Sequence, residues 1–199
     1  MSLLRLKTLR LPMIGAAACL LSGCISFGED PPPSLLTLTP EAAIQTGTGP
    51  SGEASSVLTV MRPEVPGSLA VTRVPVQVDA STIAYLQDAV WVDRPAKLFQ
   101  NLLVTTIRER TGRLVLDDVE SRSGTDAMLR GTLRDFGYDA QSGSVVVTYD
   151  AIRESGGRLE TRRFTASIPG VPAEASPVGN ALNDAANRVA LDVAEWIGG

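Results

Sequence analysis

The stretch AMLRGTLR at residues 127–134 decides the fold class of this chain. Its apolar and polar residues alternate, which is the period of a strand with one buried face and one wet face. Two further stretches favour strands by composition or alternation, VVVTY at 145–149 and, more weakly, residues 159–168. The intervening QSG at 141–143 and ESGG at 154–157 are turn sequences. Because such short connections join antiparallel neighbours, the three strands are expected to form two consecutive hairpins.

Two amphipathic helices are expected around these strands. Asp93 fits an N-cap and Pro95 fits the first turn of a helix that Gly112 would end. Ser176 and Pro177 give the same start signals for a C-terminal helix. Apolar residues of this second helix recur three and four positions apart, as a buried helix face requires: Val178, Leu182, Ala185, Val189, Val193 and Trp196.

Shorter strands are expected upstream and between the helices. Pro75 cannot donate to a ladder, so the strand that contains it is expected at a sheet edge. The pattern therefore predicts an α+β domain, a mostly antiparallel sheet with two helices packed on one face. The short strands are expected at residues 57–60, 69–71, 73–78, 83–86, 89–92 and 113–116, with a turn at 87–88 between two of them.

The N-terminus is typical of an exported protein. Arg5, Lys7 and Arg10 precede an apolar run over residues 11–21. This run is shorter and more interrupted than the roughly 20 apolar residues that span a bilayer. The sequence LSGC at 21–24 resembles the lipobox of bacterial lipoproteins, in which the cysteine is acylated and begins the mature chain. An ordinary secreted protein with a chance cysteine is the disfavoured alternative.

This interpretation divides the chain into three segments. Residues 1–23 are expected to be a lipoprotein signal peptide. Residues 24–56 are expected to be the lipidated N-terminus, on Cys24, and a flexible tether that includes a short strand at 34–38. Residues 57–199 are expected to form the folded domain. Acyl chains contribute about 0.8 kcal/mol per buried CH₂, so lipidation would hold the chain permanently at a membrane.

Composition excludes several classes of function. Loss of Arg5, Lys7 and Arg10 with the signal leaves fifteen basic and 22 acidic residues, a net charge of −7, which argues against nucleic acid as a partner. The chain contains no histidine, which excludes Ser-His and Cys-His catalysis and most zinc sites. Cys19 leaves with the signal and an acylated Cys24 cannot form a disulfide. We therefore expect no catalytic residues, no cofactor and no metal.

Three sequence motifs resemble functional sites but are better explained by ordinary structure. The stretch GTGPSG at 47–52 matches a dinucleotide fingerprint, but no clear strand precedes it and its proline removes a donor. Asp117, Asp118 and Glu120 lack a surrounding array of ligands, so they indicate a solvated turn. The arginines of the strands indicate cross-strand charge pairs on a wet sheet face, with a partner-facing patch as the alternative: Arg130, Arg134, Arg162 and Arg163.

Trp91 lies between a predicted strand and a predicted helix, directly before Asp93 and Arg94. A tryptophan in this position is most often part of the core. The functional alternative is that Trp91, Asp93 and Arg94 face a partner. Trp196, on the last helix, is expected to be a packing residue.

The order of these segments resembles a known family. TLTP at 37–40 follows the lipobox, and VPVQ at 74–77 and IAY at 83–85 come next. WVDRP at 91–95 is the most distinctive piece, followed by a helix with Leu98, Gln100 and Leu103 and a strand that reaches Phe136. This chain resembles the ABC-type transport auxiliary lipoproteins, the PqiC-like family, over nearly all of its mature length. It departs from the family pattern at Leu35-Leu36, where aromatic residues are common, and at 47–56, which is longer and looser.

The resemblance implies a non-enzymatic function. Such lipoproteins are accessory parts of transporters that pair an ATPase and a permease with an MCE-domain protein, and they dock the MCE protein on the periplasmic side. The transporters move phospholipid or other hydrophobic molecules between the inner and outer membranes. Ile25 and Ser26 lack the aspartate that retains lipoproteins in the inner membrane, so the outer membrane is the expected location. Homo-oligomerisation is a further expectation, because close relatives form rings.

A different binding module is the competing interpretation. A lipoprotein with a similar α+β domain could regulate another envelope machine, such as a cell-wall synthase. A lipid-anchored hydrolase is the weakest class, because the usual bases are absent from this chain.

Overall fold

A computed structural model of the chain describes residues 34–41, 57–118 and 127–199. These residues fall within one compact unit. The expected signal peptide, Cys24 and the glycine-rich stretch 47–52 lie outside the described residues.

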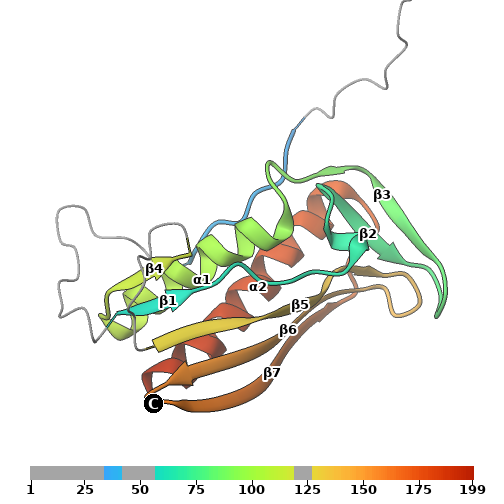
Figure 1. Ribbon diagram of the computed structural model, residues 1–199. Coiled ribbons are helices and arrows are strands. Elements are labelled where there is room, and N and C mark those ends of the chain that lie inside the picture. Colours follow the sequence, from blue (N-terminus) through green and yellow to red (C-terminus); the bar gives the residue numbers. More distant parts are fainter. Residues whose placement is uncertain (1–33, 42–56, 119–126) are drawn as a thin grey trace, which may run out of the picture. The chain divides into compact units, whose positions relative to one another are not determined.

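Seven strands and two α-helices make up the described fold, with one short 3₁₀ helix (Figure 1). In chain order they are β1 (Leu58–Val60), η2 (Gly67–Leu69), β2 (Arg73–Gln77), β3 (Ile83–Val90), α1 (Pro95–Thr111), β4 (Val115–Asp117), β5 (Ala127–Asp139), β6 (Ser144–Ser155), β7 (Arg158–Pro169) and α2 (Ala175–Gly198).

The strands form one mixed sheet with β5 at its centre. The long hairpins β5–β6 and β6–β7 are antiparallel, as expected, and so is the pair β2–β3. One end of β5 pairs in parallel with β1, which pairs in parallel with β4. The other end of β5 pairs in parallel with β2, through Val76 and Gln77. Long antiparallel hairpins therefore dominate a sheet that also holds three short parallel pairings among the described strands.

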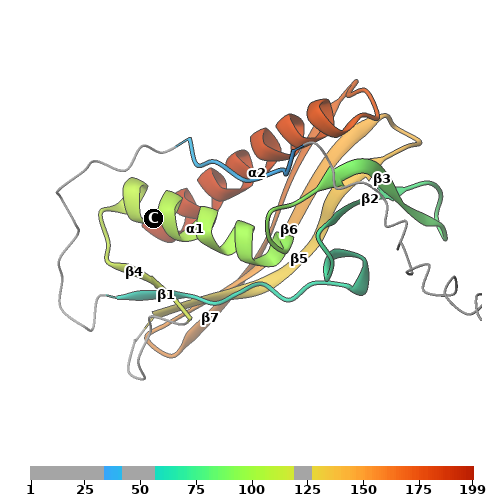
Figure 2. The same cartoon turned by 90° about the horizontal axis from the view of Figure 1, so that it is seen from above.

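Both helices cover the same face of this sheet, and they pack against each other (Figure 2). The alternation predicted for 127–134 is present, since Ala127, Leu129 and Leu133 are buried and Arg130 and Arg134 are exposed. Aromatic rings from both layers meet in the core, and the Phe99 ring of α1 lies 5.3 Å from the Tyr149 ring of β6 and 6.5 Å from the Phe136 ring of β5. The α+β prediction is confirmed.

The strand predicted at 69–71 is wrong. The amide of Leu69 donates to the carbonyl of Pro66 at 2.9 Å and the amide of Ala70 to that of Gly67 at 3.2 Å, which closes a tight 3₁₀ turn. Leu69 is 1% exposed, so the turn exists to place one apolar side chain in the core. A single buried residue in a short segment leaves no period from which a turn could be distinguished from a strand.

The edge position predicted for the strand with Pro75 is also wrong, because β2 lies between β3 and β5. Its pairing with β3 is irregular between Arg73 and Pro75, and its pairing with β5 begins only at Val76. Pro75 therefore lies where the β2–β3 ladder is interrupted and the β2–β5 ladder has not begun, so its missing N–H breaks neither ladder. The break predicted at 87–88 is a left-handed residue, Asp88 with φ 56°, inside one continuous strand.

The two helices begin close to the predicted residues but not at them. The N-cap of α1 is Arg94, and Asp93 instead accepts a hydrogen bond at 2.6 Å from the Arg94 amide. The N-cap of α2 is Glu174, and the helix already contains Ser176. The predicted stop at Gly112 is confirmed, with φ 65° and its amide bonded to the Arg108 carbonyl.

Candidate functional site

The residues singled out as partner-facing do not lie together on the surface. Trp91 is 1% exposed, and its ring lies 5.3 Å from the ring of Phe136. Burial removes this side chain from any surface, so the packing interpretation of Trp91 holds and its partner-facing assignment is corrected. Its indole nitrogen is buried without a hydrogen-bond partner among the described residues.

Asp93 and Arg94 are exposed at the start of α1. Both line a shallow cleft of about 630 Å³ between α1 and the segment that leads from β1 to η2. Glu64 and Val65 form part of the opposite wall. The cleft therefore combines charges of both signs with an apolar wall, which suits contact with a protein surface more than a small ligand.

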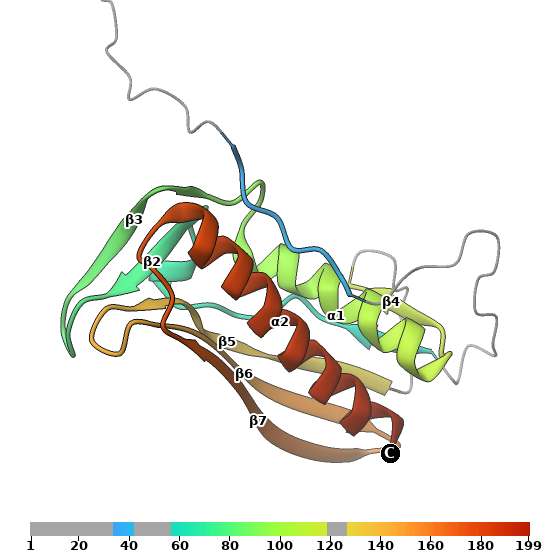
Figure 3. The same ribbon diagram turned by 180° about the vertical axis from the view of Figure 1, so that it is seen from behind.

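The segment Ser34–Glu41, which we call the strap, is attached to the domain (Figure 3). The amide of Leu36 donates to the carbonyl of Val90 at 2.8 Å, and the amide of Val92 donates to the carbonyl of Leu36 at 2.8 Å. This makes a single parallel bridge between Leu36 and Trp91, where a short strand was predicted at 34–38. The strap then continues along the helix pair.

Two asparagines of α2 hold the second half of the strap. The amide of Thr39 donates to Oδ1 of Asn183 at 2.8 Å, and the amide of Glu41 donates to Oδ1 of Asn187 at 2.9 Å. Nδ2 of Asn187 donates to the carbonyls of Thr39 and Asn183, each at 2.9 Å. Sequence reasoning missed these residues. Their signal was two amides spaced i and i+4 beside the apolar face of an amphipathic helix, where side chains stand one above the other.

A charge cluster lies on the sheet face that points away from the helices. Arg163 of β7 binds Asp150 of β6 through two hydrogen bonds, at 2.6 and 2.8 Å, and Arg134 of β5 binds the same carboxylate. These arginines hold the pKa of Asp150 well below its ordinary value. The predicted cross-strand pairs are therefore present for Arg134 and Arg163, and they stabilise the ionised form of this carboxylate.

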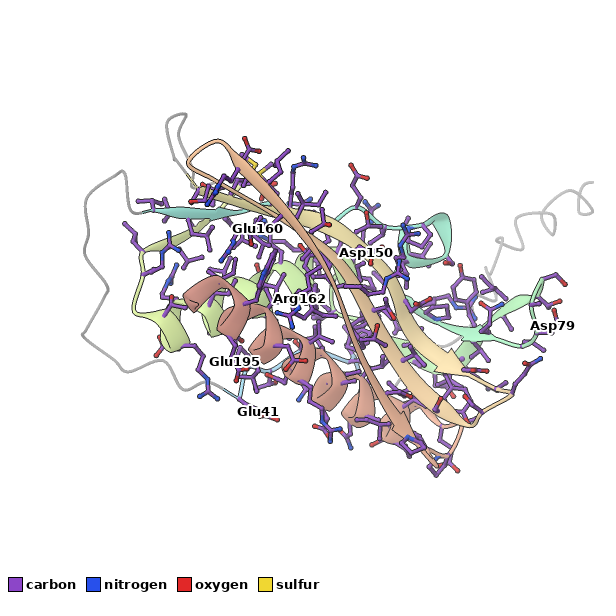
Figure 4. The ribbon with its side chains drawn as sticks, turned by 90° about the horizontal axis from the view of Figure 1, so that it is seen from below. Glu41, Asp79, Asp150, Glu160, Arg162 and Glu195 are labelled. Carbon is purple, nitrogen blue, oxygen red and sulfur yellow. The ribbon has the colours of Figure 1, made fainter. Side chains whose placement is uncertain are left out.

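Two other strand arginines were singled out: Arg130 is exposed on β5, and Arg162 lies on the opposite face of β7 from Arg163. The guanidinium of Arg162 stands over the Phe164 ring, 5.3 Å from the centroid. Figure 4 shows Arg162, Glu160 and Glu195 toward the C-terminal end of α2, with Asp79 at the far end of the strands. A groove of about 730 Å³ between β7 and α2 is lined by Arg162 and Trp196.

Trp196 packs at this groove as expected. Its ring lies 5.7 Å from that of Phe164. Arg153 lies over the indole at 4.9 Å, donates to the Trp196 carbonyl at 2.8 Å and binds Glu160 at 2.7 Å. Arg153 and Glu160 therefore pair with each other, and Arg153 connects α2 to the β6–β7 hairpin.

A second cleft, of about 430 Å³, opens beside β2 and β5. Its walls include the apolar side chains of Leu69, Phe136 and Val146 and the polar side chains of Gln77 and Arg134. Its lining is more apolar than that of the groove between β7 and α2.

The described residues contain no group of three or more histidine, cysteine, aspartate or glutamate side chains that could hold a metal ion. Asp117 forms an ion pair with Lys97 at 3.3 Å, and Asp118 accepts a hydrogen bond at 2.6 Å from Gln100. Gln100 is fully buried and also donates to the Val60 carbonyl at 3.0 Å. These aspartates therefore connect β4 to α1, and Glu120 lies outside the described residues.

Over residues 34–41, 57–118 and 127–199, no helix combines the length and the apolar character needed to cross a membrane.

The model of the ABC-type transport auxiliary lipoprotein component family matches residues 36–194, and the chain belongs to this family. The match begins within the strap and ends within α2, so the strap is part of what the family shares. The resemblance recognised in the sequence is confirmed.

Solved structures share the fold at low identity. A crystal structure of protein XCC0632 from Xanthomonas campestris is 18% identical, with a TM-score of 0.66 over 82% of this chain and 94% of that chain. A crystal structure of an uncharacterised protein is 19% identical, with a TM-score of 0.63 over 72% of this chain and 92% of that chain. The curated proteins gave no match.

Proposed function

We propose that this chain is a membrane-anchored accessory lipoprotein of an ABC transporter, and that it docks the periplasmic MCE-domain component. The transporter would move phospholipid or another hydrophobic molecule between the inner and outer membranes. The chain itself would perform no chemistry. Its anchor would be the acylated Cys24 in the outer membrane, with the domain facing the periplasm.

The attachment of the strap to the domain is the observation that carries this proposal. Ten residue steps separate Cys24 from Ser34, where the described strap begins. Ten steps of extended chain reach at most about 35 Å. A domain held this close to its anchor has a high effective concentration for a partner that reaches the same membrane. The family, an auxiliary component of ABC-type transport, supplies the class of partner.

The chemistry of the described surface is compatible with docking. Its clefts are shallow and lined by side chains of mixed polarity, and Asp150, whose pKa is strongly displaced, is held in an ion-pair cluster. A displaced pKa is a mark of catalysis only where a cleft gives substrate access to the group. A protein partner is the better match for such a surface.

Fractionation tests the anchor. In a Cys24→Ala variant the protein should leave the membrane fraction, because its acylation site is gone. Cys19→Ala is the matched control, since it removes the other cysteine of the chain without touching the acylation site, and it should stay in the membrane fraction. Continued membrane association of Cys24→Ala would overturn the anchor.

Capture from crosslinked cell envelopes tests the partner. We expect the MCE-domain protein to be recovered with the wild-type chain. Recovery of only a cell-wall synthase would overturn the transport proposal in favour of the competing binding module.

A further inference from the structure

Three exposed apolar side chains lie where the strap enters the fold. Leu35 is 54% exposed, Val92 is 56% exposed and Val71 is 39% exposed. These large side chains come from three separate segments of the chain. We call the surface that they form the exit patch.

Backbone pairing brings the three segments side by side. Leu36 bridges Trp91 in parallel, and β2 pairs with β3 in antiparallel register with Arg73 opposite Val90. The amide of Trp91 also donates to the Thr72 carbonyl at 2.7 Å, which continues this register beyond the end of β3. The bridge at Trp91 and the bond from Trp91 to Thr72 place the strap and the residues before β2 on opposite sides of the same segment.

Burial then shows which side chains point outward. Trp91 and Leu36 point inward, since Trp91 is buried and Leu36 packs against the core. Leu35 and Val92, the neighbours of these two residues, have side chains that are more than half exposed and therefore point away from the core. Val71 lies in the bend that leads into β2, directly before Thr72, and its side chain is also exposed. The three exposed apolar side chains therefore belong to neighbouring segments at this end of the sheet.

Charged groups border the exit patch. Arg73 lies on the outer face beside Val90, with its guanidinium 5.1 Å from the centroid of the Tyr85 ring. Asp93 and Arg94 follow Val92 directly and both are exposed. An apolar centre with arginines at its rim suits the boundary between acyl chains and phosphate headgroups.

We propose that the exit patch rests on the bilayer that holds the anchor, so that this end of the domain is the one that faces the membrane. The inference rests on the proposed acylation of Cys24. Leu35 is only eleven residue steps from Cys24, so the patch lies at the root of the tether. Every conformation of residues 25–33 keeps the root within about 40 Å of the anchor, because eleven steps of extended chain reach no farther. An exposed apolar cluster at that position has a hydrophobic surface always within reach.

Membrane contact at the exit patch would also fix orientation. The groove between β7 and α2 lies toward the other end of α2 from the strap's entry, since it is lined by Trp196 and Gly199. The domain would then present its C-terminal end to the periplasm, free for a partner.

A depth-sensitive label tests this inference. Acylation consumes the Cys24 thiol, so a cysteine introduced elsewhere is the single reactive thiol of the mature lipoprotein. The full lipidated chain carrying Val92→Cys is labelled with an environment-sensitive NBD fluorophore and reconstituted into phosphatidylethanolamine–phosphatidylglycerol vesicles that contain acyl-chain doxyl quenchers. Leu159→Cys is the matched control, because Leu159 is an equally exposed apolar residue, 61% exposed, on β7.

We expect quenching at position 92 to exceed quenching at position 159 by at least about twofold, because residues at an interface enter the headgroup and acyl boundary. Val71→Cys should behave like Val92→Cys, which guards against a local effect of one substitution. Equal quenching at 92 and 159, with the protein still floating with the vesicles, would overturn the membrane contact and leave the anchor intact.

Two other outcomes are separable. Failure of the wild-type chain to float with the vesicles would overturn the anchor itself, and with it the proposed function. Shielding of position 92 that requires a second copy of this chain or an added MCE protein, without doxyl quenching, would overturn the membrane contact in favour of a protein interface.

Discussion

Leu36 of the strap packs directly over Gly179 of α2. A Cβ placed on Gly179 would lie 2.5 Å from Cδ2 and 3.3 Å from Cδ1 of Leu36. Gly179 is therefore the position at which α2 leaves room for the strap. The contact joins the first described segment of the chain to its last helix.

Substitution of Gly179 should loosen the strap. In Gly179→Val the added side chain occupies the space of the Leu36 methyl groups, and overpacking of this kind costs about 1–3 kcal/mol. Hydrogen exchange at the strap amides of Leu36, Thr39 and Glu41 should accelerate by about tenfold or more. Asn180→Val, at the exposed neighbouring position, is the control and should leave strap exchange unchanged. Unchanged exchange in Gly179→Val would contradict the packing role of Gly179.

The asparagine that holds Thr39 and Glu41 should be a strong determinant of stability. Asn187 is 2% exposed, and Asn187→Ala would leave the Thr39 carbonyl and the Glu41 amide without their partner. Loss of such partners costs about 1–3 kcal/mol in the free energy of unfolding. Asn183→Ala removes a single, more exposed hydrogen bond to Thr39 and should cost less. Urea denaturation measures both, and equal effects would contradict the ranking.

The two buried tyrosines of the hairpin should respond in opposite ways to loss of the hydroxyl group. The Tyr149 hydroxyl is buried without a hydrogen-bond partner among the described residues, and burial raises its pKa. Tyr149→Phe should therefore leave stability unchanged or raise it by up to about 1 kcal/mol, because an unsatisfied polar atom is removed from the core. The Tyr138 hydroxyl donates to the Val171 carbonyl at 2.9 Å, so Tyr138→Phe should cost about 1 kcal/mol. Thermal denaturation of the two variants measures both changes. A larger loss of stability in Tyr149→Phe than in Tyr138→Phe would show that the Tyr149 hydroxyl does have a hydrogen-bond partner.

The ion pairs of Asp150 make part of the stability depend on pH. Arg163 and Arg134 lower the pKa of Asp150 in the folded state below its ordinary value of 3.8. The folded state therefore binds this proton less readily than the unfolded state does, so the stabilisation is present above about pH 4 and is lost as pH falls below it. Because the cluster is solvent-accessible, Asp150→Asn should cost only about 1 kcal/mol at pH 7.

The stability difference between wild type and Asp150→Asn should shrink as the pH is lowered from 5 to 3, measured by denaturation at each pH. Asp184→Asn, which removes a charge from an exposed position on α2, is the control for net charge. A difference that stays constant over this range would show that the carboxylate of Asp150 is not stabilised by its arginines.

Sequence patterns predicted the long elements well because each carries many repeats of one period. The strand beginning at 127–134 continues to Asp139, and the C-terminal helix extends to Gly198, so several turns or alternations agree on each assignment. The turn at Gly67–Leu69 offers one buried residue and was mistaken for a strand. The caps moved by one or two residues, because a capping residue is chosen by local geometry among several candidates.

The candidate site depended more on tertiary structure. Trp91 was singled out from the sequence, but its burial against Phe136 results from the pairing of distant strands, which local sequence patterns do not reveal. Asn187 was not singled out, since its partners on the strap lie 146 and 148 residues away. The exit patch joins segments at 35, 71 and 92, and no local period connects them.

The sequence by itself determined the alternation of the hairpins, the amphipathic helices and the family, because each depends on neighbouring residues or on their order. Only the tertiary structure decided that β2 is internal, that the strap is fastened to α2, and that Trp91 is core while Val92 is surface. Those outcomes depend on which distant backbones share hydrogen bonds. Adjacent side chains of a strand point to opposite faces, so a shift of one residue in strand pairing would exchange the buried and exposed positions.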